Sequence, residues 1–138
     1  MKNDKLEGWL VVASAIAVIL ALLWVTGAFG KEWQDDPSIT PAVHHWFQNL
    51  MQPDNPQVSC CGEADAFEAD DFETTVDEHG ETIYVAIITN GKGAIPEGTR
   101  IPIPNSKIKW DDPNPTGHGI IFISTTGTVY CYCPPAGI

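Results

Sequence analysis

Basic residues are scarce in this sequence. Seven Lys and Arg residues stand against eighteen Asp and Glu residues, so the formal net charge is -11 and the pI is about 4.4. A surface of this sign repels nucleic acid and anionic lipid headgroups, which argues against a nucleic-acid partner. Such a surface attracts a basic protein or a cation, unless the charge serves solubility alone.

Recognisable catalytic motifs are also missing. The sequence has no G-x-S-x-G, Walker or dinucleotide-binding glycine pattern, and its cysteines form no C-x-x-C pair. A single histidine in a turn, His118, is weak evidence for catalysis. We therefore expect a non-catalytic protein.

Charged residues are absent between Gly8 and Gly30. A run of this length and apolarity predicts a helix that crosses the hydrocarbon layer, about 30 Å thick. Lys2 and Lys5 precede the run and only Lys31 follows it closely, which favours a cytoplasmic N-terminus. We expect residues 1–7 in the cytoplasm, a transmembrane helix over 8–30 in a bacterial inner membrane, and the remainder in the periplasm.

A cleaved signal peptide is the alternative for the same segment, although the apolar run exceeds the usual length of about 7–15 residues.

The predicted helix carries one stripe of small residues, because Ala13, Ala17 and Ala21 recur at four-residue spacing. Such stripes let helices approach closely in the membrane. The stripe therefore predicts contact with other transmembrane helices of a larger complex.

The predicted outer part begins with a polar stalk over 31–40 and continues as one domain over 41–138. Thr40 is a suitable N-cap, and Pro41 suits the first position of a helix. The helix that follows has an apolar face formed by Val43, Trp46, Phe47, Leu50 and Met51. The sequence 52–56, which contains two prolines, ends it.

The rest of the domain is predicted to be β-structure. Residues 72–76 alternate in polarity, residues 82–89 are apolar on both faces, and the prolines of 95–104 indicate an edge strand or an extended loop. Residues 120–133 predict a final hairpin. We expect an α+β domain in which the amphipathic helix packs on one mostly antiparallel sheet of about four to six strands, or a small open barrel.

Four cysteines, Cys60, Cys61, Cys131 and Cys133, are predicted to form disulfides if the domain lies outside the cytoplasm. Joining adjacent cysteines requires a strained ring, so pairings between the early loop and the last strand are favoured. Such a bond closes a loop of about 70 residues and stabilises the fold by roughly 4 kcal/mol. Because the two late cysteines share one face of a strand, two simultaneous bridges to the adjacent early pair are geometrically tight, and the alternative is one bridge with one buried or free thiol.

Two other functions for these cysteines remain open. The first is a copper or zinc site formed by the four sulfurs with His44 and His118, although the ligand spacing is unusual. The second is thiol–disulfide redox chemistry, which a strained Cys60–Cys61 bond would suit.

An acidic run lies between the predicted helix and the predicted strands; its carboxylates belong to Glu63, Asp65, Glu68, Asp70, Asp71 and Glu73. The run lacks the spacing and the central glycine of an EF-hand calcium loop. We interpret it as a solvated surface on which a basic periplasmic protein could dock. If the complex transfers electrons, this partner could be a basic carrier such as a cytochrome c.

Three short motifs resemble those of a group of small exported bacterial proteins with no known activity. They are HWF at residues 45–47, CCGEAD at 60–65 and CYCPP at 131–135. The resemblance implies a periplasmic location and transfers no functional residue. We expect a non-catalytic, single-pass accessory subunit of a larger inner-membrane complex, with a metal-binding or thiol-redox protein as the alternative.

Overall fold

The computed structural model describes residues 33–111 and 113–135. Its helical elements are η1 (Trp33–Asp35), α2 (Pro41–Asn49), η2 (Glu63–Asp65) and η3 (Asn105–Lys107). Its strands are β1 (Ala66–Glu68), β2 (Asp71–Val76), β3 (Thr82–Ile87), β4 (Arg100–Ile103), β5 (Ile120–Ile123) and β6 (Val129–Cys133).

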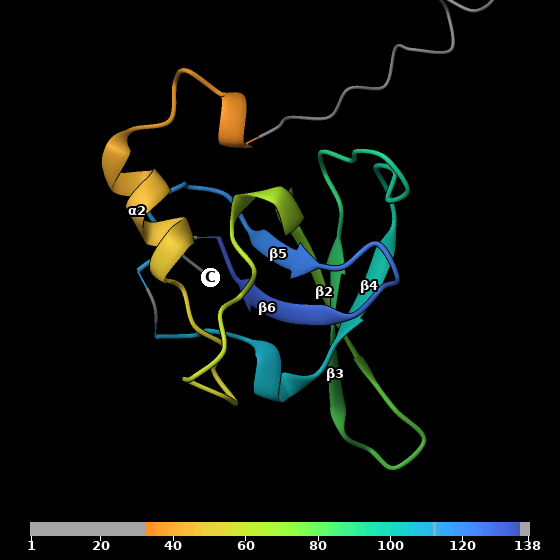
Figure 1. The fold of residues 1–138 in the computed structure, drawn as a ribbon. Helices are drawn as coiled ribbons and strands as arrows, with labels where there is room; N and C mark the ends of the chain where they lie inside the picture. The colour runs from red at the N-terminus through yellow and green to blue at the C-terminus, as the bar shows by residue number, and fades with distance from the viewer. Residues whose placement is uncertain (1–32, 112, 136–138) are drawn as a thin grey trace, which may run out of the picture.

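The strand β5 lies in the middle of the domain because all four of its residues are apolar and buried. It is the central strand of an antiparallel sheet with the order β1-β5-β6, and a second antiparallel sheet has the order β2-β3-β4. Ile120 and Phe122 belong to the core shared with α2, whereas Ile121 and Ile123 belong to the core shared with the second sheet. The domain therefore has three layers, with the β1-β5-β6 sheet between α2 and the other sheet (Figure 1).

This arrangement corrects the predicted architecture, which was a transmembrane helix followed by one helix on a single sheet of four to six strands. The six strands form two separate sheets of three. The physical reason lies in β5, because a strand that is apolar on both faces needs cover on both. The nine-residue helix α2 covers one face, and the second sheet covers the other.

The chain passes from one sheet to the other at Ala69 and Asp70, between β1 and β2. Gly119 lies against this crossover, and a Cβ atom there would be 2.2 Å from the carbonyl oxygen of Ala69. The absence of a side chain lets the Ala69 N–H donate to the Gly119 carbonyl at 2.7 Å. The Tyr132 hydroxyl also donates to the Ala69 carbonyl, at 3.1 Å.

The predicted amphipathic helix is present as α2. Thr40 is its N-cap, with the hydroxyl accepting from the Val43 N–H at 3.4 Å, and Pro41 begins the helix. Phe47 is fully buried and contacts both Trp46 and Phe122 through its ring. The final hairpin is also present as β5 and β6, and β4, which contains Pro102, is an edge strand as the prolines predict.

The predicted transmembrane helix over 8–30, with the stripe of Ala13, Ala17 and Ala21, lies outside the described residues. Among the residues that the structure does describe, no helix is long and apolar enough to cross a membrane.

Candidate functional site

A disulfide between Cys60 and Cys131 joins the loop before η2 to the last strand. This confirms the prediction that the early loop is covalently tied to the C-terminal hairpin. Both half-cystines are fully buried in the core between α2 and the central sheet. The bond spans 71 residues of sequence, so it constrains most of the domain in the unfolded state.

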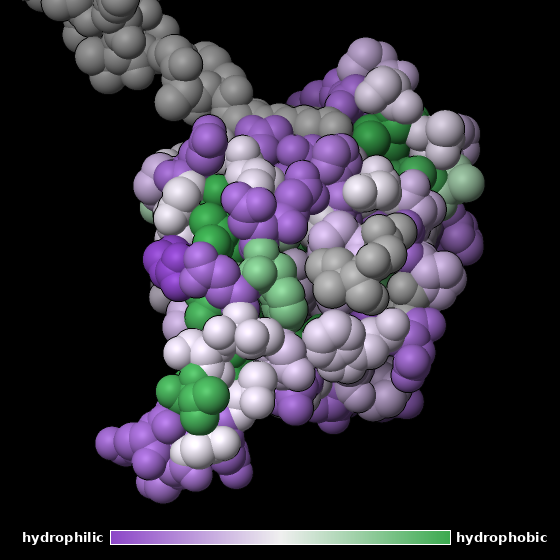
Figure 2. Space-filling view, turned by 180° about the vertical axis from the view of Figure 1, so that it is seen from behind, coloured by the Kyte–Doolittle hydropathy of each residue, from purple (hydrophilic) through white to green (hydrophobic). Residues whose placement is uncertain are grey.

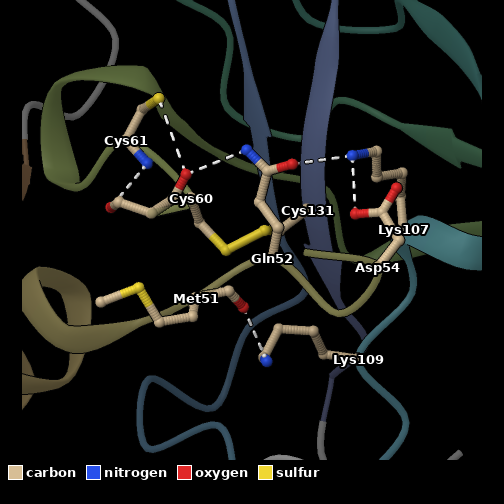
Figure 3. The surroundings of a disulfide bond; sticks show 9 residues. Met51, Gln52, Asp54, Cys60, Cys61, Lys107, Lys109 and Cys131 are labelled. Carbon is tan, nitrogen blue, oxygen red and sulfur yellow. Dashed lines mark hydrogen bonds and ion pairs between the residues drawn. A yellow bond between two sulfur atoms is a disulfide. The ribbon is translucent and has the colours of Figure 1, made fainter. Parts of the chain in front are cut away.

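The loop 51–59 is held around this disulfide by two lysines from the segment after β4. Lys107 donates to the Gln52 side chain at 2.7 Å and to the Asp54 carboxylate at 2.8 Å (Figure 3). Lys109 donates to the carbonyl of Met51 at 2.9 Å. Gln52 is 8% exposed and also donates to the Ser59 carbonyl at 3.0 Å. These contacts fix the loop that carries Cys60.

Cys61 and Cys133 take no part in that disulfide. Cys133 is buried in the same core, whereas Cys61 is exposed at the surface beside η2. Partial burial raises the pKa of the Cys61 thiol, and the negative charge of Asp65 raises it further. A raised pKa leaves less of the reactive thiolate at neutral pH, so this environment does not activate Cys61 for exchange chemistry.

The residues of the alternative metal site lie in different environments. Two of the four sulfurs are bonded to each other, which removes them as thiolate ligands. His44 Nδ1 lies 2.6 Å from the Glu63 carboxylate, and His118 Nδ1 lies 3.0 Å from that of Asp70. No cluster of three or more candidate metal ligands occurs among the residues described.

The six carboxylates of the acidic run do not form one continuous surface. Glu63 pairs with His44, and Asp70 accepts from the Gly119 N–H at 2.7 Å as well as contacting His118. Glu68 is 8% exposed and accepts from the Asn90 side chain. Asp65 is half-buried, while Asp71 and Glu73 are exposed. The docking function predicted for this run remains a prediction, and Asp71 and Glu73 are its accessible members.

Glu73 forms a bidentate ion pair with Arg100 across the outer face of the second sheet. Glu73 lies opposite Val85 on β3, and Arg100 lies opposite Ile87, so the pair spans β3 from one edge strand to the other. The Arg100 guanidinium holds the pKa of the Glu73 carboxyl below its usual value. Val85, the residue of β3 opposite Glu73, is 7% exposed.

The Lys and Arg side chains of the described part all donate hydrogen bonds within the domain. The Lys and Arg residues of the described part are Lys92, Arg100, Lys107 and Lys109, and each donates to an oxygen of the domain. Exposed carboxylates remain, among them Glu78, Glu81, Glu97 and Asp111. Because Asp and Glu outnumber Lys and Arg in the described part, its outer surface is negative, which suits a basic partner.

Trp33, which the sequence places in the stalk, is a core residue. It is 2% exposed, and its ring lies 5.3 Å from that of Phe47 and 6.4 Å from that of His118. Trp33 and Ile39 therefore hold the segment 33–40 at the domain, and the chain enters the domain beside α2 and the central sheet.

Sequence reasoning missed a cluster of aromatic rings on the second sheet and beside it. Phe72 and Tyr84 stack with their centroids 5.4 Å apart, and Phe72 also stacks on Tyr132 at 5.7 Å. Trp110 packs edge-on against Phe72 and Tyr84 and is 49% exposed. One feature of the sequence could have indicated this cluster, namely the isolated tryptophan Trp110 in the polar segment KWDD.

No protein-family model matches the chain, and no curated protein or solved structure is detectably similar to it. The function must therefore be inferred from the residues themselves, and the resemblance to small exported bacterial proteins remains a prediction.

Proposed function

We propose that this protein is a non-catalytic accessory subunit of a bacterial inner-membrane complex, and that its folded domain lies on the periplasmic side and docks a basic protein. The apolar segment 8–30 attaches the domain to the membrane in this proposal. The disulfide supports an oxidising compartment such as the periplasm, because cytosolic thiols are kept reduced.

The observation that carries the proposal is the burial of Trp33. A freely tethered domain needs a flexible linker next to its anchor, yet Trp33 is only three residues beyond Gly30 and is already part of the core. This short connection holds the domain close to the end of the apolar segment. A docking surface on the domain is thereby kept at a defined distance from that segment, which suits a subunit of an assembly.

The negative surface supports a basic partner. Asp and Glu residues far outnumber the four Lys and Arg residues of the described part, so the exposed carboxylates dominate the field that an approaching protein meets. Complementary charge raises the association rate and makes it sensitive to salt.

The test is extraction of the full-length protein from its native membrane in a mild detergent, followed by mass measurement and identification of co-purifying proteins. We expect a particle larger than the monomer that contains integral membrane proteins in fixed stoichiometry. A variant with a flexible Gly-Ser spacer between Lys31 and Glu32 should lose much of this association, whereas the same spacer in the exposed loop between Gly93 and Ala94 should not. Recovery of the wild-type protein alone as a monomer would show that the proposal is wrong.

A further inference from the structure

A partly exposed apolar strip runs along the inner face of the β2–β3 hairpin and ends beside the segment after β4; its middle, Phe72 and Tyr84, packs against the core. It consists of Phe72, Val76, Tyr84 and Trp110, and we call it the aromatic strip. The strand register places Phe72, Val76 and Tyr84 on the same face of the sheet, with Tyr84 diagonal to both other residues. Val76 is 63% exposed and Trp110 is 49% exposed, so the strip is accessible at both ends.

The hairpin projects beyond the rest of the domain (Figure 1), and its inner face is uncovered near the tip, where Val76 is 63% exposed. From behind, hydrophobic surface is visible next to the hydrophilic tip of the hairpin (Figure 2). Val76 is the last residue of β2, immediately before the turn 77–81. The uncovered face therefore begins at the tip and continues towards the body of the domain.

The ring of Trp110 is held in place although half of it is exposed. Its centroid lies 5.3 Å from that of Tyr84 and 6.3 Å from that of Phe72, with steep interplanar angles of 70° and 85°. Phe72 is itself stacked on the fully buried Tyr132. A rigid, exposed aromatic side chain loses little conformational entropy on binding, and tryptophan and tyrosine dominate the energetics of many interfaces.

A hollow of about 360 Å³ lies beside Trp110. It is lined by Pro53, Ile108, Lys109, Trp110 and Asp111. A hollow of this size has room for one side chain of a partner beside the Trp110 ring.

Carboxylates flank the strip at both ends. Asp77, Glu78 and Glu81 form the hairpin tip beyond Val76, and Asp111 follows Trp110 directly. The strip therefore combines an apolar, aromatic centre with a negative hairpin tip, and at its other end Asp111 lies beside Lys109, which donates to the Met51 carbonyl. A second copy of this chain would bring like charges together, and a neutral glycan would gain nothing from them.

We propose that the aromatic strip binds an extended, proline-containing segment of a partner protein with Lys or Arg residues on both sides of the prolines. Proline-rich segments are already extended before binding, and their rings pack well in grooves lined with aromatic side chains. The basic flanks pair with the hairpin tip and with Asp111. This inference rests on the proposed function, since it identifies the surface by which the accessory subunit docks its basic partner.

The test is isothermal titration of the full-length protein in detergent with three probes. The first is a short synthetic peptide with a proline-rich centre and arginines at both ends, the second is the same peptide with glutamates at the ends, and the third is a chitooligosaccharide. We expect binding of the first probe only, with affinity that falls as salt is added. Binding of the glutamate peptide or the sugar in preference to the arginine peptide would overturn the inference.

Substitutions locate the binding surface. Trp110→Ala should weaken binding by about tenfold or more, in the range of an interface hot spot. Val76→Ser should also weaken binding, and it leaves the core untouched because Val76 is 63% exposed. Val58→Ser is the matched control, because Val58 is 42% exposed in the loop that carries Cys60. Equal affinity of the wild-type, Val76→Ser and Val58→Ser proteins would contradict the proposed surface.

Charge variants complete the test. Neutralising Glu78 and Glu81 should reduce both the affinity and its salt dependence, whereas Glu97→Gln, at another exposed position, should change neither.

The proposed accessory function and the proposed peptide site can fail separately. If the protein is purified alone but the peptide still binds at Trp110, the accessory function is wrong and the peptide site stands. If the membrane complex is recovered equally well with Val76→Ser and Trp110→Ala, the accessory function stands and the strip is not its docking surface.

Discussion

At the scale of single residues, two adjacent cysteines have different chemistry because their side chains have different surroundings. Cys60 is buried and bonded to Cys131, whereas Cys61 is exposed and has a backbone φ of 77°. This left-handed conformation is unfavourable for residues other than glycine. The Cys61 N–H donates to the Ser59 hydroxyl at 3.0 Å, a contact that helps to hold this turn (Figure 3).

We predict that Cys61 reacts slowly with alkylating reagents at neutral pH. Burial and the charge of Asp65 raise its pKa, so the thiolate that attacks the reagent forms only at higher pH than for a free thiol. The measurement is the rate of iodoacetamide labelling against pH, followed by mass spectrometry. Asp65→Asn should shift this profile towards lower pH, whereas Glu97→Gln should not. A midpoint at or below that of free cysteine would contradict the prediction.

At the scale of elements, the crossover between the two sheets depends on one glycine. Ala69 and Asp70 connect β1 with β2, and Gly119 approaches them more closely than any residue with a side chain could. The Asp70 carboxylate accepts a hydrogen bond from the Gly119 N–H. The Ala69 N–H donates to the Gly119 carbonyl, and the Ala69 carbonyl accepts from the Tyr132 hydroxyl. Several hydrogen bonds therefore converge at this crossover, and Thr89 and Asn90 add further contacts with Glu68 at the end of β1.

We predict that Gly119→Ala destabilises the domain by about 1–3 kcal/mol, the usual cost of inserting an atom into a packed site. The new Cβ would displace the Ala69 carbonyl, so the Ala69 N–H should also exchange with solvent much faster. Urea unfolding and amide hydrogen exchange measure the two effects. Gly80→Ala, where the Cβ meets nothing within 4 Å, should leave the exchange of Ala69 unchanged. Unaltered exchange of Ala69 in Gly119→Ala would show that the crossover tolerates a side chain.

At the scale of the whole molecule, a covalent bond joins the layers of a small domain. The Cys60–Cys131 disulfide connects the loop after α2 with the central sheet, inside the core that also contains Trp33 and Phe47. Small domains bury a limited apolar area, so a crosslink contributes a large share of their stability.

We predict that the double variant Cys60→Ala/Cys131→Ala loses about 4 kcal/mol of unfolding free energy, as the chain-entropy model gives for a closed loop of this length. Urea unfolding without reductant measures the difference. Cys61→Ala is the matched control and should change stability by less than about 0.5 kcal/mol, because its side chain is exposed. A double variant as stable as the parent would show that the disulfide is dispensable for the fold.

Local features were predictable from the sequence because their causes are local. The helix after Thr40 follows from an N-cap, a proline at the first position and an apolar face, and the final hairpin follows from two β-rich segments around Gly127. The disulfide between the early loop and the last strand follows from the strain that adjacent cysteines would carry.

Only the tertiary structure decided how these elements combine. Whether six strands form one sheet or two depends on which layers cover β5, and this is a matter of long-range packing. The burial of Trp33 depends on contacts with Phe47 and His118, which are distant in sequence. The aromatic strip likewise joins β2, β3 and Trp110, because strand register brings together side chains whose local sequences carry no common pattern.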